Sequence, residues 1–308
     1  MNLKMGCGNV RFVTAKTDEK VFVGVIDETS QTVLHVREAQ RKKEEKVTIP
    51  ITMLECIDRG ESFITKVIEI VEWAKEHCQD AYYPLSEVKL LAPIPRPRKN
   101  ILCVGKNYYE HVIEMDKEGT IPENIIIFTK APTTVIGEGD QIYSHPHATN
   151  ELDYEGELAI VIGKRGKAIP KEEALHHVFG YTIVNDVTAR DIQKKHKQFF
   201  LGKSFDTFCP MGPSIVHHSM IHNPNALHIE TKVNGEVRQS STTANMMFSI
   251  EEIISIISKG MTLEPGDIIA TGTPAGVGKG FQPPRFLHAG DEVAITVENV
   301  GTLRNAVK

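Results

Sequence analysis

Two glutamates separated by a single residue are the clearest chemical feature of this chain. Glu155 and Glu157 lie in the segment DYEGELAIVI at residues 153–162, where they lead into an apolar, β-branched run. Because a strand alternates its side chains between two faces, this spacing directs both carboxylates toward one point. Like charges that close repel each other unless a cation or a shared proton lies between them. The pair therefore indicates a metal site.

A second apolar segment adds a third carboxylate. Residues 181–185 are typical of a buried strand, and Asp186 follows them at once. An all-oxygen ligand set favours a hard ion, because zinc usually recruits histidine or cysteine. We therefore predict that Glu155, Glu157 and Asp186 bind Mg²⁺ or Mn²⁺. The competing interpretation is an edge strand with both glutamates in solvent. The apolar run disfavours it, as does Gly156, which allows another backbone or a ligand to approach closely.

A candidate base follows the apolar run at residues 101–104. His111 and Glu114 are three residues apart and would face the same way on a helix. Glu114 can then fix the tautomer of His111 and support its positive charge when it takes a proton from water. The alternative is an ordinary surface ion pair. The metal site is the independent reason to prefer the catalytic interpretation.

Three cations, Lys130, Arg190 and Lys203, belong to segments that can reach the same site. They are expected there because three carboxylates around Mg²⁺ leave a charge of −1, which repels an anionic substrate. One lysine at about 4 Å contributes roughly 4 kcal/mol at an effective dielectric of 20. Lys203, between a glycine and a serine, is expected in a tight ligand-facing loop, and Lys130 and Arg190 are expected to contact the substrate. The alternative for each is a solvated surface position.

The glycine-rich segment TGTPAGVGKG at residues 271–280 is not a nucleotide-binding loop. Five residues separate Gly272 from Gly278, where the Walker pattern needs four, and a glycine follows Lys279 where that pattern needs serine or threonine. The dinucleotide fingerprint is not met either. We expect backbone amides of this loop and the Thr273 hydroxyl to bind a small carboxylate.

The charge balance favours a small-molecule partner. The chain has 308 residues and a formal net charge of −5, with 35 basic residues interspersed among 40 acidic ones. This distribution offers no electrostatic surface for nucleic acid or for an anionic membrane. No stretch approaches the length of a bilayer span and the start has no apolar signal core, so a cytoplasmic location is expected. The five cysteines form no C-x-x-C pair and are expected to be reduced thiols.

Two domains are expected, separated by a proline-rich linker. Residues 1–92 are typical of a small α+β domain with a helix over residues 62–77. The alternating prolines of residues 93–100 impose an extended, poorly paired linker. Residues 101–308 are dominated by strand signals and form the expected catalytic domain.

The fold expected for this larger region is mainly β with some α (α+β). Asn234-Gly235 predicts a tight hairpin, and Ser249 with Glu252 predicts the capped start of a helix that runs to Lys259. Because β-α-β alternation is absent, a mixed β-sandwich, roll or barrel is favoured over a doubly wound parallel sheet.

Taken together, these motifs resemble the fumarylacetoacetate hydrolase family. The resemblance covers about residues 100–308 and is carried, in order, by GKNY with His111 and Glu114, DYEGEL, NDVTARD, Lys203-Ser204 and TGTP. It is similar in detail to the branch that contains acylpyruvate hydrolases and bacterial oxaloacetate decarboxylases. No motif position is substituted here.

The resemblance implies a β-rich roll, a homodimer and Mg²⁺ or Mn²⁺ at the three carboxylates. It also implies that a helix matching residues 108–115 acts as a lid and brings the His111 and Glu114 dyad over the substrate. The positions that it places against the substrate are Lys203, Arg190, Gln193 and Thr273.

The implied reaction is cleavage of a carbon–carbon bond in a small 2-oxo acid through a metal-stabilised pyruvate enolate. Oxaloacetate decarboxylation is the first choice. One alternative is hydrolysis of an acylpyruvate such as fumarylpyruvate or acetylpyruvate, in which His111 deprotonates water. Another is isomerisation or decarboxylation of a hydroxyheptadienedioate-type catabolite. A non-enzymatic alternative is a regulatory protein whose N-terminal domain binds a partner, which an exposed apolar patch on residues 1–92 would favour.

Overall fold

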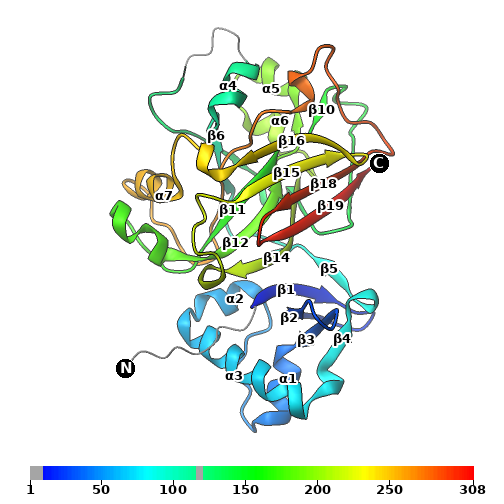
Figure 1. The fold of residues 1–308 in the computed structure, drawn as a ribbon, viewed down its shortest axis with the longest axis vertical. Coiled ribbons are helices and arrows are strands. Elements are labelled where there is room, and N and C mark those ends of the chain that lie inside the picture. Colours follow the sequence, from blue (N-terminus) through cyan, green and yellow to red (C-terminus); the bar gives the residue numbers. More distant parts are fainter. Residues whose placement is uncertain (1–9, 116–120) are drawn as a thin grey trace.

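The segment that carries the paired glutamates forms a central strand of a large mixed sheet. A computed structural model describes residues 10–115 and 121–308. Within these residues, twelve strands share the sheet (Figure 1). Its main path, in spatial order, is β4 (Tyr82–Pro84), β3 (Thr32–His35), β2 (Val21–Asp27), β1 (Arg11–Lys16), β14 (Cys209–His217), β12 (Val178–Asn185), β11 (Gly156–Ile162), β17 (Ile268–Ala270), β6 (Ile101–Gly105) and β7 (Ile126–Lys130). On its flanks, β5 (Lys89–Leu91) pairs with β1 and β8 (Val135–Ile136) pairs with β14.

A five-stranded sheet packs against the larger one beside the glutamates. Its order is β16 (Glu236–Thr242), β15 (His228–Val233), β18 (Glu292–Val297), β19 (Gly301–Val307) and β9 (Gln141–Ile142). The predicted hairpin joins β15 to β16, where Asn234 and Gly235 adopt φ values of 52° and 80°. Gly156 lies where the two sheets meet, because a Cβ there would be 2.3 Å from Thr231 Oγ1. The predicted close approach is therefore made by a neighbouring side chain.

The helices are short apart from one. They are α1 (Val36–Lys43), α2 (Met53–Asp58), α3 (Glu61–His77), α4 (Tyr109–Met115), α5 (Arg190–His196), α6 (Phe200–Lys203) and α7 (Ile250–Ser258). The predicted helices correspond to α3, α4 and α7, and the capping box of Ser249 and Glu252 is present. The sequence prediction missed α1, α2, α5 and α6, although Thr52 and Glu55 form a capping box at the start of α2. Among the described residues, no helix combines the length and apolar character needed to cross a membrane.

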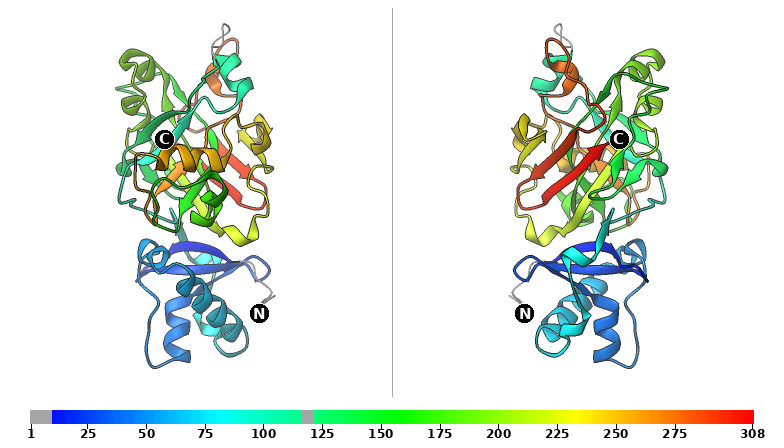
Figure 2. Two further views of the ribbon diagram at one scale, coloured as in Figure 1. Left: turned by 90° about the vertical axis from the view of Figure 1, so that its left-hand side faces the viewer. Right: turned by 90° about the vertical axis from the view of Figure 1, so that its right-hand side faces the viewer.

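The N-terminal region joins the larger region through both the sheet and the core. Strand β1 pairs with β14, with Phe12 opposite Ile215, and one hydrophobic cluster includes Phe12 and Val25 together with Val161 and Met211. Figure 2 shows the N-terminal strands between the larger region and helices α1 and α3. The linker of residues 93–100 forms no strand, as expected. The division of the chain into two domains stays a prediction, to which the structure adds this shared sheet.

These sheets confirm the predicted fold class. The architecture is a mixed, mainly β fold with helices at its periphery, and β11 and β12 lie in its interior with every residue buried. Burial on both faces explains the continuous apolar runs of these two strands. The carboxylates at the ends of β11 and β12 are therefore held by a well-packed part of the core.

Candidate active site

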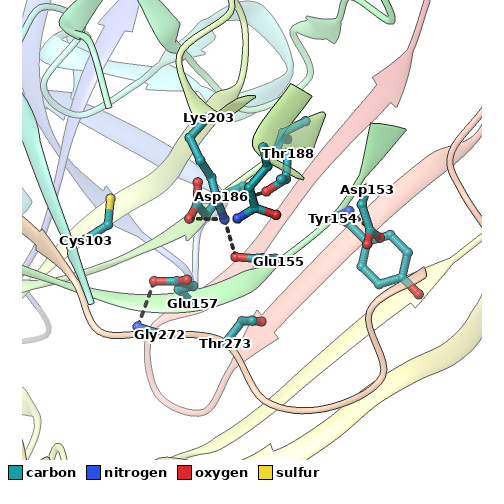
Figure 3. A network of polar contacts seen from close by, with 12 residues as sticks. Cys103, Asp153, Tyr154, Glu155, Glu157, Asp186, Thr188, Lys203, Gly272 and Thr273 are labelled. Atoms are coloured by element: carbon teal, nitrogen blue, oxygen red, sulfur yellow. Dashed lines mark hydrogen bonds and ion pairs between the residues drawn. The ribbon is translucent and has the colours of Figure 1, made fainter. Parts of the chain in front are cut away.

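Antiparallel pairing of two buried strands brings the three predicted metal ligands together. Gly156 at the start of β11 lies opposite Asn185 at the end of β12, so Glu155 and Asp186 become neighbours. The Asp186 amide donates to the Glu155 carbonyl at 2.8 Å. Carboxylate oxygens of Glu155, Glu157 and Asp186 all lie within 4.8 Å of one another, and the three residues are buried. The spacing argument from the sequence therefore leads to a compact carboxylate cluster (Figure 3).

Two lysines neutralise part of this cluster. The Lys203 ammonium lies 2.6 Å from Glu155 Oε2 and 2.7 Å from Asp186 Oδ2 (Figure 3), and it faces the Phe128 ring at 5.1 Å. Lys203 is the last residue of helix α6, not part of the expected loop. Lys130 Nζ lies 2.5 Å from Asp186 Oδ1 and donates to the Val187 carbonyl at 3.1 Å. Both lysines are almost completely buried.

Arg190 connects the cluster to a fourth carboxylate, Asp153. The Arg190 Nη1 atom lies 2.7 Å from Glu155 Oε1, and its Nε donates to Asp153 Oδ2 at 2.8 Å. The same Nη1 donates to Gln193 Oε1 at 3.3 Å. Its Nη2 is buried and has no hydrogen-bond partner among the described residues. A buried donor without a partner is costly, so this atom is suited to a ligand in the adjacent cavity.

The two glutamates have pKa shifts in opposite directions. Burial raises the pKa of Glu155, but the Lys203 and Arg190 cations outweigh it and hold that pKa well below its ordinary value. Burial raises the pKa of Glu157, and the carboxylates of Asp186 and Glu155 raise it further. Glu157 is thus the candidate ligand whose negative charge the protein itself compensates least. A bound divalent cation would supply that compensation.

The donor set fits a hard divalent ion. Each oxygen of Glu155 and Asp186 has one cationic partner, and Glu157 Oε2 accepts the Gly272 amide at 2.8 Å. A carboxylate oxygen carries two lone pairs, so every ligand keeps one for a metal. The structure therefore contains a candidate acidic metal-binding cluster of oxygen ligands, of the kind that Mg²⁺ and Mn²⁺ prefer.

The predicted dyad is also formed. His111 lies on α4 with Nδ1 3.2 Å from Glu114 Oε2, and the other oxygen of Glu114 accepts the Gly276 amide at 2.9 Å. This arrangement leaves Nε2 of His111 to exchange a proton. The His111 ring is close enough to Glu155 to contribute to the lowering of its pKa. The dyad therefore borders the carboxylate cluster.

Gly280 leaves the space that the Glu114 side chain occupies, because a Cβ at this position would be 2.1 Å from Glu114 Oε1. We expect Gly280→Ala to turn Glu114 away from His111 and to lower turnover by about 10- to 100-fold, the loss typical of an impaired proton-transfer group. A steady-state assay measures this loss. Gly260→Ala is the matched control, since nothing lies within 4 Å of its added Cβ. Equal activity of the two variants would contradict the positioning role of Glu114.

The glycine-rich segment at residues 271–280 binds carboxylates of the protein itself. The amides of Gly278 and Lys279 donate to Asp153 at 2.7 and 3.0 Å, and those of Gly272 and Gly276 donate to Glu157 and Glu114. These four amides therefore do not fit the prediction that the loop binds a small carboxylate ligand, because each already donates to a carboxylate. The carboxylates are side chains, so these amides position catalytic candidates instead of a ligand.

Asp153 is the buried residue whose role sequence reasoning missed. It is fully buried and accepts hydrogen bonds from Arg190 and from two loop amides. Its spacing of two residues from Glu155 was the available signal, because it continues the same alternation. The bonds of Thr273 are local: its hydroxyl donates to the Gly156 carbonyl at 3.0 Å and accepts from Gln239 at 2.8 Å.

A cavity of about 380 Å³ adjoins the cluster. The described residues that line it include most of the predicted ones, namely His111, Glu155, Glu157, Arg190, Gln193, Lys203 and Thr273. Lys130 is not among them. Because its ammonium is fully buried against Asp186, the predicted substrate contact does not fit its position, and Lys130 instead orients the candidate ligand Asp186. Further lysines, unpredicted from the sequence, complete the wall: Lys106, Lys194, Lys197 and Lys279.

Known proteins of similar sequence include an enzyme of matching length. The chain is 54% identical over 301 residues to the oxaloacetate tautomerase YisK of Bacillus subtilis, which covers 97% of this chain and 100% of that protein. Among solved structures, a fumarylacetoacetate hydrolase of Exiguobacterium antarcticum shares 42% identity with a TM-score of 0.81, over 97% of this chain and 99% of that one.

A more distant structure contains a metal. The maleylpyruvate hydrolase of Sphingobium, in complex with manganese(II) and pyruvate, is 28% identical with a TM-score of 0.75, over 96% of this chain and 98% of that one. Residues 100–308 match the family model for the C-terminal region of fumarylacetoacetate (FAA) hydrolase. The sequence, the fold and these relatives agree, and the chain belongs to the fumarylacetoacetate hydrolase family.

Proposed function

We propose that this protein is a divalent-metal-dependent enzyme that converts a small 2-oxo acid, with oxaloacetate as the first candidate. The observation that carries the proposal is the convergence of three carboxylates and a histidine–glutamate dyad on one cavity. The name of the Bacillus subtilis relative, an oxaloacetate tautomerase, supports the choice of substrate. Mg²⁺ or Mn²⁺ remains the proposed cofactor.

Glu155, Glu157 and Asp186 would bind the cation. When bound, it supplies a Lewis acid for the keto and carboxylate oxygens of the substrate. Arg190 offers its unpartnered Nη2 to the same carboxylate. Lys203 keeps Glu155 ionised, pairs with Asp186 and stabilises negative charge that develops nearby. Lys130, which does not line the cavity, orients Asp186 through its buried ion pair.

His111 would move the proton. With Glu114 bonded to Nδ1, the free Nε2 can take a proton from C3 of the substrate while Glu114 stabilises the resulting imidazolium. This transfer interconverts the keto and enol forms of oxaloacetate. Loss of CO₂ from oxaloacetate passes through a similar distribution of charge but needs no proton removal from C3. We therefore propose tautomerisation together with decarboxylation as activities of one site.

Hydrolysis of an acylpyruvate is the second candidate. It is favoured by the similarity to a maleylpyruvate hydrolase and by the position of His111, which can also deprotonate water. The homodimer stays a prediction. The regulatory alternative receives little support from residues 10–92, where the exposed large hydrophobic residues are Val21 and Ile51, on separate segments.

The decisive experiment compares two substrates with purified protein and Mg²⁺ or Mn²⁺. With oxaloacetate, two rates are measured: conversion of the enol to the keto form (ketonisation) and release of pyruvate. With acetylpyruvate, release of pyruvate is measured. Each assay has a chelator control and a protein-free control. We expect metal-dependent turnover of oxaloacetate above the spontaneous rate. A preference for acetylpyruvate would replace the first candidate by the second, and inactivity on both would refute the proposal.

His111→Ala separates the proposed reactions. We expect tautomerisation and hydrolysis to fall by about 10²- to 10⁴-fold, because both need a base, and decarboxylation to fall much less. His176→Ala is the matched control, since His176 and Glu173 form the same i, i+3 pair at 2.8 Å in an exposed position. Equal losses in tautomerisation and decarboxylation would contradict the assignment of His111 as the base.

A further inference from the structure

The buried charges of the site do not balance a dianionic substrate. They are the carboxylates of Asp153, Glu155, Glu157 and Asp186 and the cations of Lys130, Arg190 and Lys203. Four negative and three positive charges leave −1, and a divalent cation changes this to +1. A 2-oxo acid with one carboxylate neutralises that charge. A 2-oxo diacid brings a second negative charge, which needs a further cation in the cavity.

Two half-buried lysines of the cavity wall, Lys106 and Lys279, can supply that cation. Lys279 is the better candidate because its backbone amide is anchored on Asp153, the carboxylate that also binds Arg190. Lys279 is half-buried and lines the cavity, and among the described residues no carboxylate lies within salt-bridge distance of its ammonium. Burial and the nearby Arg190 cation lower the pKa of Lys279. Lys194 and Lys197 also line the cavity but are exposed, so solvent screens their charges more strongly.

The backbone of Lys279 is fixed between the dyad and Arg190. Its amide donates to Asp153 Oδ2 at 3.0 Å, the same oxygen that accepts the Arg190 Nε atom. Three residues earlier, the Gly276 amide donates to Glu114, which is bonded to His111. Lys279 thus lines the cavity from a segment whose backbone is anchored to both functional groups. This rigidity suits a residue that selects a ligand.

We propose that Lys279 binds the distal carboxylate of a 2-oxo diacid and thereby favours proton transfer at C3 over loss of CO₂. The inference rests on the proposed function and names its substrate class. In tautomerisation a proton leaves C3, the C–H electron pair forms the C2–C3 double bond, and the C2 oxygen takes a proton. The distal carboxylate keeps its charge throughout, so its ion pair with Lys279 is maintained.

Decarboxylation instead destroys this ion pair. The C3–C4 bond breaks, its electron pair passes toward the C2 oxygen, and the carboxylate leaves as neutral CO₂. An ammonium paired with that carboxylate stabilises the starting state more than the transition state and so slows the step. Lys279 is thus a specificity residue with opposite effects on the two reactions.

Binding of two unreactive 2-hydroxy acids tests the subsite without turnover. Malate carries the distal carboxylate and lactate lacks it, and calorimetric titration in the presence of Mg²⁺ gives the affinity of each. We expect Lys279→Met to weaken malate binding by about 10-fold or more, since a charge-assisted hydrogen bond is lost, and to leave lactate binding unchanged. Lys279→Arg should restore most of the preference, and Lys195→Met, at an exposed position outside the cavity lining, should have no effect.

The product ratio provides the second readout. We expect Lys279→Met to raise the ratio of pyruvate release to ketonisation from oxaloacetate by several-fold. The assignment would be overturned if Lys279→Met kept the preference for malate over lactate. It would also be overturned if Lys106→Met lost this preference and Lys279→Met did not. Wild-type protein that fails to convert oxaloacetate would refute the proposed function instead, whereas the malate and lactate affinities test the subsite independently.

Discussion

Glu157→Gln is expected to abolish metal-dependent turnover while leaving the folded protein at least as stable in chelator. Glutamine preserves the shape of the side chain and can still accept the Gly272 amide. It removes the Glu157 carboxylate, whose pKa is raised by burial and by the neighbouring carboxylates. Because a metal supplies several kcal/mol of transition-state stabilisation, we expect a loss of at least about 10³-fold in kcat.

The stability measurement makes this prediction specific. A carboxyl group with a raised pKa favours folding below its ordinary value of 4.5, and that contribution is lost as the pH rises through the raised pKa. At neutral pH, wild-type protein in chelator therefore carries a cost that Glu157→Gln removes. Added Mg²⁺ should raise the Tm of wild-type protein and not that of the variant. Glu172→Gln, at an exposed position, is the control. A metal-induced Tm shift retained in Glu157→Gln would show that Glu157 is not a ligand.

Lys203→Met should have the opposite signature, with both activity and stability lost. The buried ammonium pairs with Glu155 and Asp186 at 2.6 and 2.7 Å, and the substitution leaves two buried carboxylates without this partner. Removal of one member of a buried charge cluster costs about 3–5 kcal/mol in the free energy of unfolding. Chemical denaturation in chelator measures this cost, and turnover is expected to fall below detection.

Metal should partly rescue the stability of Lys203→Met, since a divalent cation compensates the same carboxylates. Mg²⁺ is therefore expected to raise the free energy of unfolding more in this variant than in wild-type protein. Lys167→Met, at an exposed position, should change stability by no more than about 0.5 kcal/mol. A Lys203→Met protein as stable as this control in chelator would contradict the role assigned to the buried ammonium.

Local patterns predicted those parts of the fold that depend on neighbouring residues. The helix expected over residues 62–77 is found at Glu61–His77, and the hairpin turn and the capped start of α7 occur at the expected residues. Each of these features depends on periodicity or on contacts within a few residues. Helix α2 carries the same kind of local signal in the capping box of Thr52 and Glu55, so its start is also encoded by neighbouring residues.

Local patterns also predicted one part of the candidate site, namely the carboxylates and the histidine–glutamate dyad. Alternation along a strand placed Glu155 and Glu157 together, and the end of the next buried strand added Asp186. Spacing on a helix joined His111 to Glu114. These relations span a few residues, or arise from two buried strands that follow each other in the sequence, so residue type and period sufficed to predict them.

Tertiary structure decided how the cations and the loop amides are used. Lys130 lies behind Asp186, and Lys203 lies between Glu155 and Asp186, because β7 and α6 meet the ends of β11 and β12 in the folded chain. Asp153 receives amides of a loop 125 residues away in the sequence. The sequence by itself determined which residues can bind a metal or move a proton. Which oxygen faces which cation depends on the register of distant strands, which no local pattern specifies.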